Sequence, residues 1–241
     1  IFVNIPVTPL ADATPPTISR IDTRTLGKNG DTITVRSTEI GTIYLVNSSV
    51  TVSSVASITA AAAGNMNSVA ISSVNTNTVL TLSSLNDGIY NLYGADSANN
   101  LSTGIMATIR VDNTAPTATT IEVNPAGTAV VITGSETLTN SMQLYGIYQV
   151  TDSGSALSVN NVVFSGNVAT LSLSRAIPAG ATVYFTYTPG SGDARGRIVD
   201  LAGNEMAAIA KRAITNNSNS AISVTLTVPM LCPKIQTDRK S

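Results

Sequence analysis

The residues of this chain that can do chemistry are mainly oxygen ligands, and they gather in short phrases that recur about a hundred residues apart. The phrase DSANN at 96–100 returns as DLAGN at 200–204, and DN at 112–113 opens the linker between them. Calcium takes six to eight oxygen ligands from carboxylates, carboxamides and backbone carbonyls. The candidate calcium ligands are therefore Asp96, Asn100, Asp112, Asn113, Asp200 and Asn204.

The same residues also have a purely structural use. Aspartate and asparagine in such phrases cap a tight turn by hydrogen-bonding their own backbone. Carboxylates are sparse in this chain, so a calcium site here would be weak. Calcium is the only cofactor that the sequence suggests, and turn capping is the alternative.

Most enzymatic chemistry is excluded by composition. The chain has no histidine, which removes Ser-His-Asp and Cys-His catalysis and the usual near-neutral general base. With no histidine and one cysteine, Cys232, the chain lacks the usual nitrogen and sulfur ligands of a tetrahedral zinc site. There is no glycine-rich phosphate loop, and the 14 acidic residues lie mostly in turns and linkers rather than in pairs of the glycosidase kind. We expect a protein that is not an enzyme.

Charge and hydropathy exclude two further classes of partner. Only 11% of the 241 residues are charged and the formal net charge is −1, so the chain has no basic field that would attract nucleic acid. No apolar run approaches the roughly 20 residues of a membrane-spanning helix. Cys232 cannot form an intramolecular disulfide, and its pairing with another chain stays open. The first residue is Ile1, so we expect a processed chain or a fragment.

These phrases sit in a chain that repeats itself. DATPPT at 12–17 returns as DNTAPT at 112–117, and self-similarity at a long fixed period indicates tandem modules. The repeat predicts an N-terminal extended segment at 1–13, one domain at 14–114, a second at 115–217, and a C-terminal strand and tail at 218–241.

Nearly every periodic segment alternates polar and apolar residues, as β-strands do. In the first module the predicted strands are 18–22, 31–36, 42–46, 68–72, 79–82, 89–93 and 105–111, with one short helix within 52–63. In the second they are 119–122, 129–133, 143–150, 161–164, 168–173, 182–187 and 207–214. About seven short strands per module predict a β-sandwich in each. Val183, Phe185 and Tyr187 share one face, which we expect to line the core.

The two ends carry β-like runs outside these modules. The run 220–228 places Ile222, Val224, Leu226 and Val228 on one face and hydroxyl side chains on the other, and 1–7 is similar in character. A lone amphipathic strand needs a partner. The partner lies in its own module, in a truncated third module, or in another chain.

The order of phrases in the first module resembles a known family. GTIYLVNSS at 41–49, NSVAIS at 67–72 and DGIYNLYGADSANNLS at 87–102 are similar to the bacterial Ig-like repeats of large surface adhesins, over about residues 14–114. GSETL at 134–138, ATVYFTYTP at 181–189 and IVDLAGN at 198–204 resemble a SwmB-type Ig-like module over about 115–217. This module departs from that family at Gly134, where the pattern has phenylalanine.

The resemblance implies an all-β fold of two tandem Ig-like β-sandwiches, here with extra β-strand segments at both ends. It also implies a modular protein outside the cell, calcium at the module junctions, and no catalysis.

Two functions remain. The first is a non-enzymatic structural or adhesive protein at a microbial cell surface, whose partners are further Ig-like modules, other copies of itself, or surface glycans and proteins. The alternative is a self-assembling subunit of an extracellular filament or surface layer, joined by strand donation from the chain ends. A glycan-binding module ranks last, because tryptophan is absent and aromatic residues make up only 4%.

Overall fold

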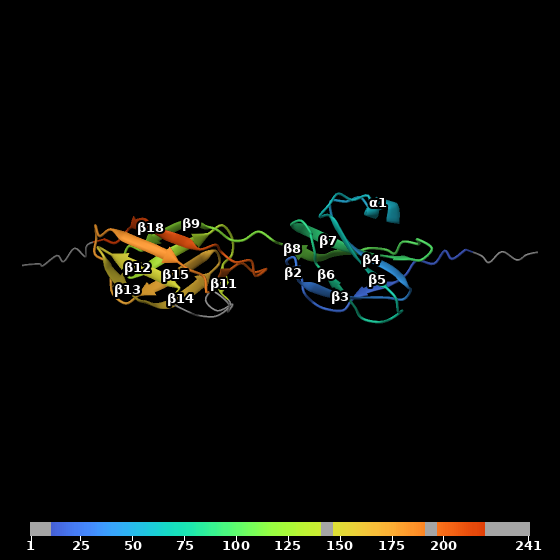
Figure 1. The fold of residues 1–241 in the computed structure, drawn as a ribbon, viewed down its shortest axis with the longest axis horizontal. Helices are drawn as coiled ribbons and strands as arrows, with labels where there is room; N and C mark the ends of the chain where they lie inside the picture. Colours follow the sequence, from blue (N-terminus) through green and yellow to red (C-terminus); the bar gives the residue numbers. More distant parts are fainter. Residues whose placement is uncertain (1–10, 141–146, 191–196, 220–241) are drawn as a thin grey trace, which may run out of the picture.

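The computed structural model describes residues 11–140, 147–190 and 197–219. It contains two β-sandwiches that follow each other along the chain and are joined end to end by a short extended linker (Figure 1). The described helix is α1 (Val55–Thr59), a short helix of five residues at the rim of the first sandwich. No helix in the described part of the chain has the length and apolar character needed to cross a membrane.

The first sandwich has a sheet of three strands and a sheet of five. The smaller has the order β1 (Ile18–Arg20), β3 (Thr32–Ser37), β6 (Thr78–Thr81). The larger has the order β2 (Leu26–Gly27), β8 (Ile105–Val111), β7 (Gly88–Asp96), β4 (Gly41–Asn47), β5 (Met66–Ile71). The first segment thus divides between the sheets: β1 pairs antiparallel with β3, and β2 pairs parallel with β8. This two-sheet arrangement of short antiparallel strands is Ig-like.

Alternate side chains of both sheets fill the first core. Ile33 and Val35 from one sheet meet Ile43, Leu45 and Leu92 from the other, all fully buried. Tyr90 on β7 is also buried, and its hydroxyl lies 2.8 Å from the Asn86 carbonyl oxygen and 2.6 Å from that of Gly64. A tyrosine that bonds back to the backbone just before its own strand is a recurrent corner of Ig-like sandwiches.

The second sandwich also has two layers, but they are joined at one edge into a single eight-stranded sheet. One half is β9 (Ala118–Val123), β10 (Ala129–Gly134), β15 (Val168–Leu173), β14 (Val159–Ser165). The other is β13 (Ser155–Leu157), β12 (Tyr148–Asp152), β16 (Val183–Tyr187), β18 (Ile209–Asn216). The last of the described strands, β18, pairs parallel with β9 and so joins the halves. A short separate pair consists of β11 (Thr139–Asn140) and β17 (Ile198–Val199).

The second core confirms the predicted face of β16. Val183, Phe185 and Tyr187 are 1%, 0% and 0% exposed. The Tyr187 ring stacks on Tyr148 with centroids 5.6 Å apart, and its hydroxyl accepts a hydrogen bond of 2.9 Å from the Ile198 amide. Burial raises the pKa of both phenols above the ordinary tyrosine value.

The all-β prediction is confirmed, and so is the short helix within 52–63. That helix begins at a capping box, in which Ser54 and Ser57 satisfy each other's backbone amides. The sequence missed four strands of two or three residues, β2, β11, β13 and β17, which are too short to show a period of two. The strand expected at 143–150 begins at Tyr148 and runs on to Asp152.

Several predictions fall outside the described residues. They are the first part of the 143–150 strand, the end segments 1–7 and 220–228, and Cys232. The extra strands at the two ends therefore remain predictions.

Replacing Phe185 by alanine should lower the free energy of unfolding of the second module by about 3–5 kcal/mol, the usual cost of emptying a buried phenylalanine site. The matched control is Tyr184→Ala. Tyr184 is 37% exposed on the opposite face, beside the Lys211 ammonium, and its loss should cost less than about 1 kcal/mol. Chemical denaturation of both variants measures the difference, and similar losses would contradict the burial argument.

Limited proteolysis should cut first in the stretch between the last strand of one sandwich and the first strand of the next. That stretch is 112–117, between β8 and β9, and the predicted boundary near Thr114 lies within it. Mass spectrometry of the early fragments identifies the bond. Early cuts within 20–100 would argue against this division into domains.

Candidate cation sites

Two clusters of three carboxylates stand out among the described residues. One joins Asp12, Glu39 and Asp96, and we call it the outer cluster. The other joins Asp112, Glu136 and Asp200, and we call it the junction cluster. In each, one carboxylate oxygen per residue lies within 4.8 Å of the others. Oxygen atoms that share a calcium ion at 2.3–2.6 Å fall within about 5 Å of each other, so the spacing in both clusters is compatible with a shared calcium ion.

The two clusters are built in the same way from three parts of the chain. The first aspartate lies in the linker that enters the module, the glutamate lies just before a strand (β4 or β11), and the second aspartate lies at the end of β7 or directly after β17. Pairing of Gly41 with Asp96, and of Thr139 with Val199, brings the last two parts together. A side chain at Gly41 would overlap the Ala95 carbonyl, so glycine is required for this close pairing.

Each cluster rests on a turn that its own aspartate caps. Asp96 Oδ1 accepts hydrogen bonds of 2.8 Å from the amides of Ala98 and Asn100, and Asp200 Oδ1 accepts one of 2.8 Å from the amide of Asn204. Turn capping and metal binding are compatible, because each carboxylate oxygen has two lone pairs and the capping bonds leave some of them free.

An asparagine ties each turn to the incoming linker. Asn100 Nδ2 donates to Asp96 Oδ2 at 2.7 Å and to the Asp12 carbonyl at 3.0 Å. Asn204 Nδ2 donates to Asp200 Oδ2 at 2.7 Å and to the Asp112 carbonyl at 2.9 Å. Both hydrogens of each amide are thereby used. Each asparagine thus holds the linker aspartate of its cluster close to the capped turn.

The crowding of negative charge shows in the carboxyl pKa values. The pKa of Glu39 is raised by desolvation and by the charges of Asp12 and Asp96. The pKa of Glu136 is raised by desolvation and by Asp200 and Asp112, against an opposing effect of Arg110. Desolvation would also raise the pKa of Asp96, but hydrogen bonds from Asn100, Ala98 and Asn99 outweigh it and the net shift is downward. A bound cation would relieve the repulsion at both glutamates.

The junction cluster has basic neighbours. Arg110 Nη2 lies 3.3 Å from Asp112 Oδ2, and the Lys28 ammonium, from the first module, donates to the Gly203 carbonyl in the second. A crevice of about 150 Å³ lies here, and its lining includes Leu26 of the first module and Leu201 of the second. Within the described ranges no ion pair reaches a carboxylate of the outer cluster. The outer cluster therefore keeps more of its negative charge.

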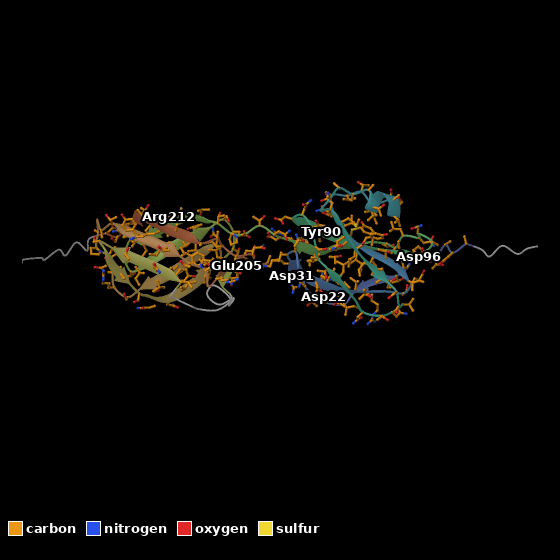
Figure 2. All side chains as sticks on the ribbon, viewed as in Figure 1. Asp22, Asp31, Tyr90, Asp96, Glu205 and Arg212 are labelled. Atoms are coloured by element: carbon orange, nitrogen blue, oxygen red, sulfur yellow. The ribbon has the colours of Figure 1, made fainter. Side chains whose placement is uncertain are left out.

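The structure places Asp96 in the outer cluster, and Asp112 and Asp200 in the junction cluster. Asn100 and Asn204 lie next to these clusters and bond to their linkers. Figure 2 shows Asp96 at the end of the first module that faces away from the second.

Asn113 lies in neither cluster. Its side chain bonds to the Leu85 carbonyl and to Asp87 at 3.0 and 2.9 Å, and accepts from the Asn29 amide at 2.8 Å. It joins two loops at the end of the first module.

Sequence reasoning missed Asp12, Glu39 and Glu136. Asp12 heads the same phrase as Asp112, which was a usable signal. Each glutamate follows a hydroxyl residue, Thr38 or Ser135, whose side chain accepts from a linker threonine amide. Such a short pattern is apparent only once the structure is known.

No protein-family model matches the sequence, and no curated protein sequence does. Among solved structures, a BSP domain of a biofilm associated protein is 12% identical with a TM-score of 0.26, and the match covers 83% of this chain and 30% of that one. The chain thus spans under a third of that structure.

Two other structures are matched over nearly their whole length. Rst D1-D2 is 12% identical with a TM-score of 0.32, covering 86% of this chain and 100% of the other. Fibronectin(III)-like modules of Clostridium thermocellum CbhA are 10% identical with a TM-score of 0.26, covering 84% and 95%. Scores this low carry no functional argument, so the Ig-like assignment rests on the strand order of the chain itself.

Calcium binding should release protons and weaken as the pH falls towards the ordinary glutamate pKa of about 4.3. A raised carboxyl pKa means that the folded state holds its proton more tightly than the unfolded state. In the absence of calcium, the stability of the fold therefore falls as the pH rises through the range just above the ordinary glutamate pKa of about 4.3. The ion needs the deprotonated group and displaces that proton. Calorimetric titration in buffers of different ionisation enthalpy measures the release.

Two variants make this test specific. Glu136→Gln should remove the part of the proton release that comes from the junction cluster. Glu122→Gln is the control, because Glu122 bonds to Asn217 outside both clusters, and its titration should match that of the unmodified chain. Equal effects of the two substitutions would argue against a site at Glu136.

Proposed function

We propose that this chain is a non-enzymatic structural segment of a microbial cell-surface protein, and that calcium braces the ends at which its Ig-like modules join. One observation carries the proposal: the same carboxylate cluster is built twice, and each copy couples the linker that enters a module to a turn of that module. This role requires no catalytic residues, which agrees with the absence of histidine from the sequence.

The mechanism is mechanical. The linker 112–117 contains Pro116, whose φ is fixed, and the Thr117 amide donates to Ser135 Oγ at 3.0 Å. Asn204 and Lys28 add contacts across the junction. An ion shared by Asp112, Glu136 and Asp200 would add a further link between the linker and the second module. Bending at the junction would then require breaking metal–oxygen bonds.

The weakness of such sites supports a location outside the cell. A site with three carboxylates and few other oxygen ligands resembles those of extracellular modules, which bind calcium at about 10⁻⁴–10⁻³ M. Such a site fills in an external medium and stays empty at the far lower calcium levels of a cytosol. The resemblance of the first module to adhesin repeats and of the second to SwmB-type modules supports the same location. The partners we propose are further Ig-like modules.

Calcium should stiffen the junction of the purified chain. Small-angle X-ray scattering in millimolar calcium should show a narrower distribution of inter-module distances than scattering in EDTA. Asp112→Ala should abolish that difference, because it removes the linker ligand of the junction cluster.

Asp12→Ala is the matched control. It removes the equivalent ligand of the outer cluster, so it should keep the calcium effect on the junction and lose only the calcium effect on the melting temperature of the first module. Identical scattering with calcium and with EDTA in the unmodified chain would refute the bracing role.

A further inference from the structure

One edge of the second sandwich is open at the point where β13 leaves its sheet. β13 pairs with β12 at only three positions, Val150 with Leu157, Thr151 with Ala156 and Asp152 with Ser155. The chain then crosses through Ser158 to β14 in the other half of the sandwich. In the described part of the chain, β12 therefore has no strand beside Tyr148 and Gln149 on that side.

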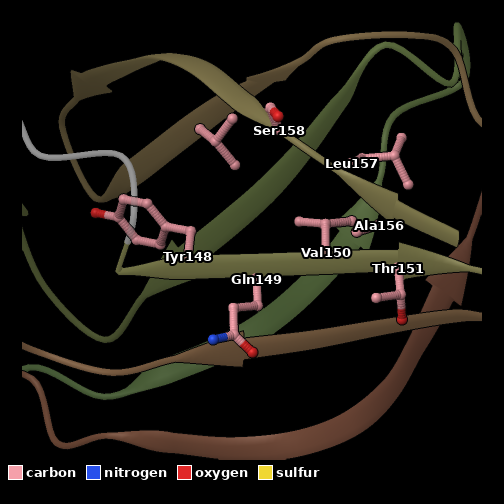
Figure 3. Close-up of a pocket in the computed structure, with 8 residues that line it drawn as sticks. Tyr148, Gln149, Val150, Thr151, Ala156, Leu157 and Ser158 are labelled. Carbon is pink, nitrogen blue, oxygen red and sulfur yellow. The ribbon is translucent and has the colours of Figure 1, made fainter.

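A hollow of about 430 Å³ lies at this opening. Tyr148, Val150, Leu157 and Val159 form its floor and belong to the core, while Ser158 is exposed at its mouth. Figure 3 shows Tyr148 and Ser158 on facing sides of the opening, with Val150 between Tyr148 and Thr151 along β12. Its lining residues, 148–151 and 156–159, include no Asp, Glu, Lys or Arg. An extended, uncharged segment with one apolar face has the chemistry to fill it.

The chain carries such a segment directly after its last described residue. Residues 213–233 contain no charged side chain, and within them Ile222, Val224, Leu226 and Val228 alternate with hydroxyl residues and alanine. Nine extended residues span about 30 Å, enough to run the length of a short edge strand. Their apolar face would meet the core at the hollow, and their hydroxyl face would meet solvent.

The position of this segment favours a second copy as its donor. The amides of Asn217 and Asn219 donate to the Val123 and Pro125 carbonyls at 3.3 and 2.9 Å, so the chain leaves alongside β9. The order β13-β12-β16-β18 puts three strand spacings, about 14 Å, between β18 and β13. To reach its own hollow, the segment would have to reverse direction and cross the sheet. A segment from another molecule has no such constraint.

We propose that residues 220–228 of one copy add as a strand to the open edge of β12 in a second copy. The incoming backbone would pair beside Tyr148 and Gln149 and would bury its apolar face over the hollow. The donor segment and the acceptor edge are different surfaces of one chain, so the contact is head-to-tail and generates an open polymer. This inference goes beyond the proposed spacer function, and it does not depend on calcium.

The test is the mass of the full chain by light scattering across a concentration series, with EDTA to remove calcium and a reductant to keep Cys232 from cross-linking. The average mass measured for the unmodified chain should rise with concentration, because the copies assemble. Val224→Asp should remain a monomer because it spoils the donor face, and Thr225→Asp, on the opposite face, should still assemble. Ser158→Arg should remain a monomer because it fills the mouth of the hollow. Ser155→Arg, the same change at an exposed position outside the hollow, should still assemble.

Mixing the two non-assembling variants gives the sharpest result. Val224→Asp keeps its acceptor edge and Ser158→Arg keeps its donor segment, so together they should form a dimer that grows no further. Circular dichroism of each variant checks that it is folded. An unmodified chain that stays monomeric at all concentrations would overturn the proposal, as would assembly that Ser158→Arg leaves intact. A monomer whose second module is destabilised by Val224→Asp would show that the segment pairs within its own chain, which also overturns it.

Discussion

The two sandwiches depend on the burial of one face of each sheet, because nothing covalent can join the sheets. The only cysteine is Cys232, near the end of the chain, so no disulfide holds either core. Each module is held instead by alternating aliphatic side chains and by a buried tyrosine on its central strand, Tyr90 on β7 or Tyr187 on β16. Both tyrosines satisfy their hydroxyls with backbone groups, as a polar atom in a core requires. Because the cores fix the ends of the strands, the carboxylate clusters at those ends keep their arrangement even where the loops of the two modules differ.

The two clusters have the same arrangement, although the strand that leads to the second aspartate differs between the modules. In the first module β7 runs unbroken from Gly88 to Asp96. In the second the equivalent strand ends at Tyr187 and resumes at Ile198 as β17. The hydrogen bond from the Ile198 amide to the Tyr187 hydroxyl anchors the resumed strand to the core. Asp200 consequently reaches the same position relative to its linker as Asp96, although it lies more than twice as far along the chain from Tyr187 as Asp96 lies from Tyr90.

Local patterns in the sequence predicted what depends on local physics. The face of β16 and the strand segments follow from alternation within a few residues, and the short helix follows from the alanine-rich run within 52–63. The ligand sets did not follow in the same way. Glu39 meets Asp96 only because β4 pairs with β7 in one particular register, and no local pattern encodes that register. Asn113 illustrates the opposite error, because its neighbour Asp112 points to the junction cluster while Asn113 itself turns towards Asp87 and Leu85. Proximity along an extended linker does not imply a shared site.

The parallel pairs at the end of each module have a consequence for a chain under tension. A pull on the two ends draws the entering segment of a module, which includes β2 in the first module and β9 in the second, away from β8 or β18 along the strand direction. In the first module β2 and β8 are joined by the Arg110 and Asp112 amides donating to the Thr25 and Gly27 carbonyls. In the second module the Asn217 amide donates to the Val123 carbonyl beyond β18. Because the strands are parallel, the load falls on these bonds together, in shear, and they cannot open one at a time as the pairs of a hairpin do. The short β2, which alternation in the sequence did not reveal, is therefore the element that would oppose such a pull in the first module.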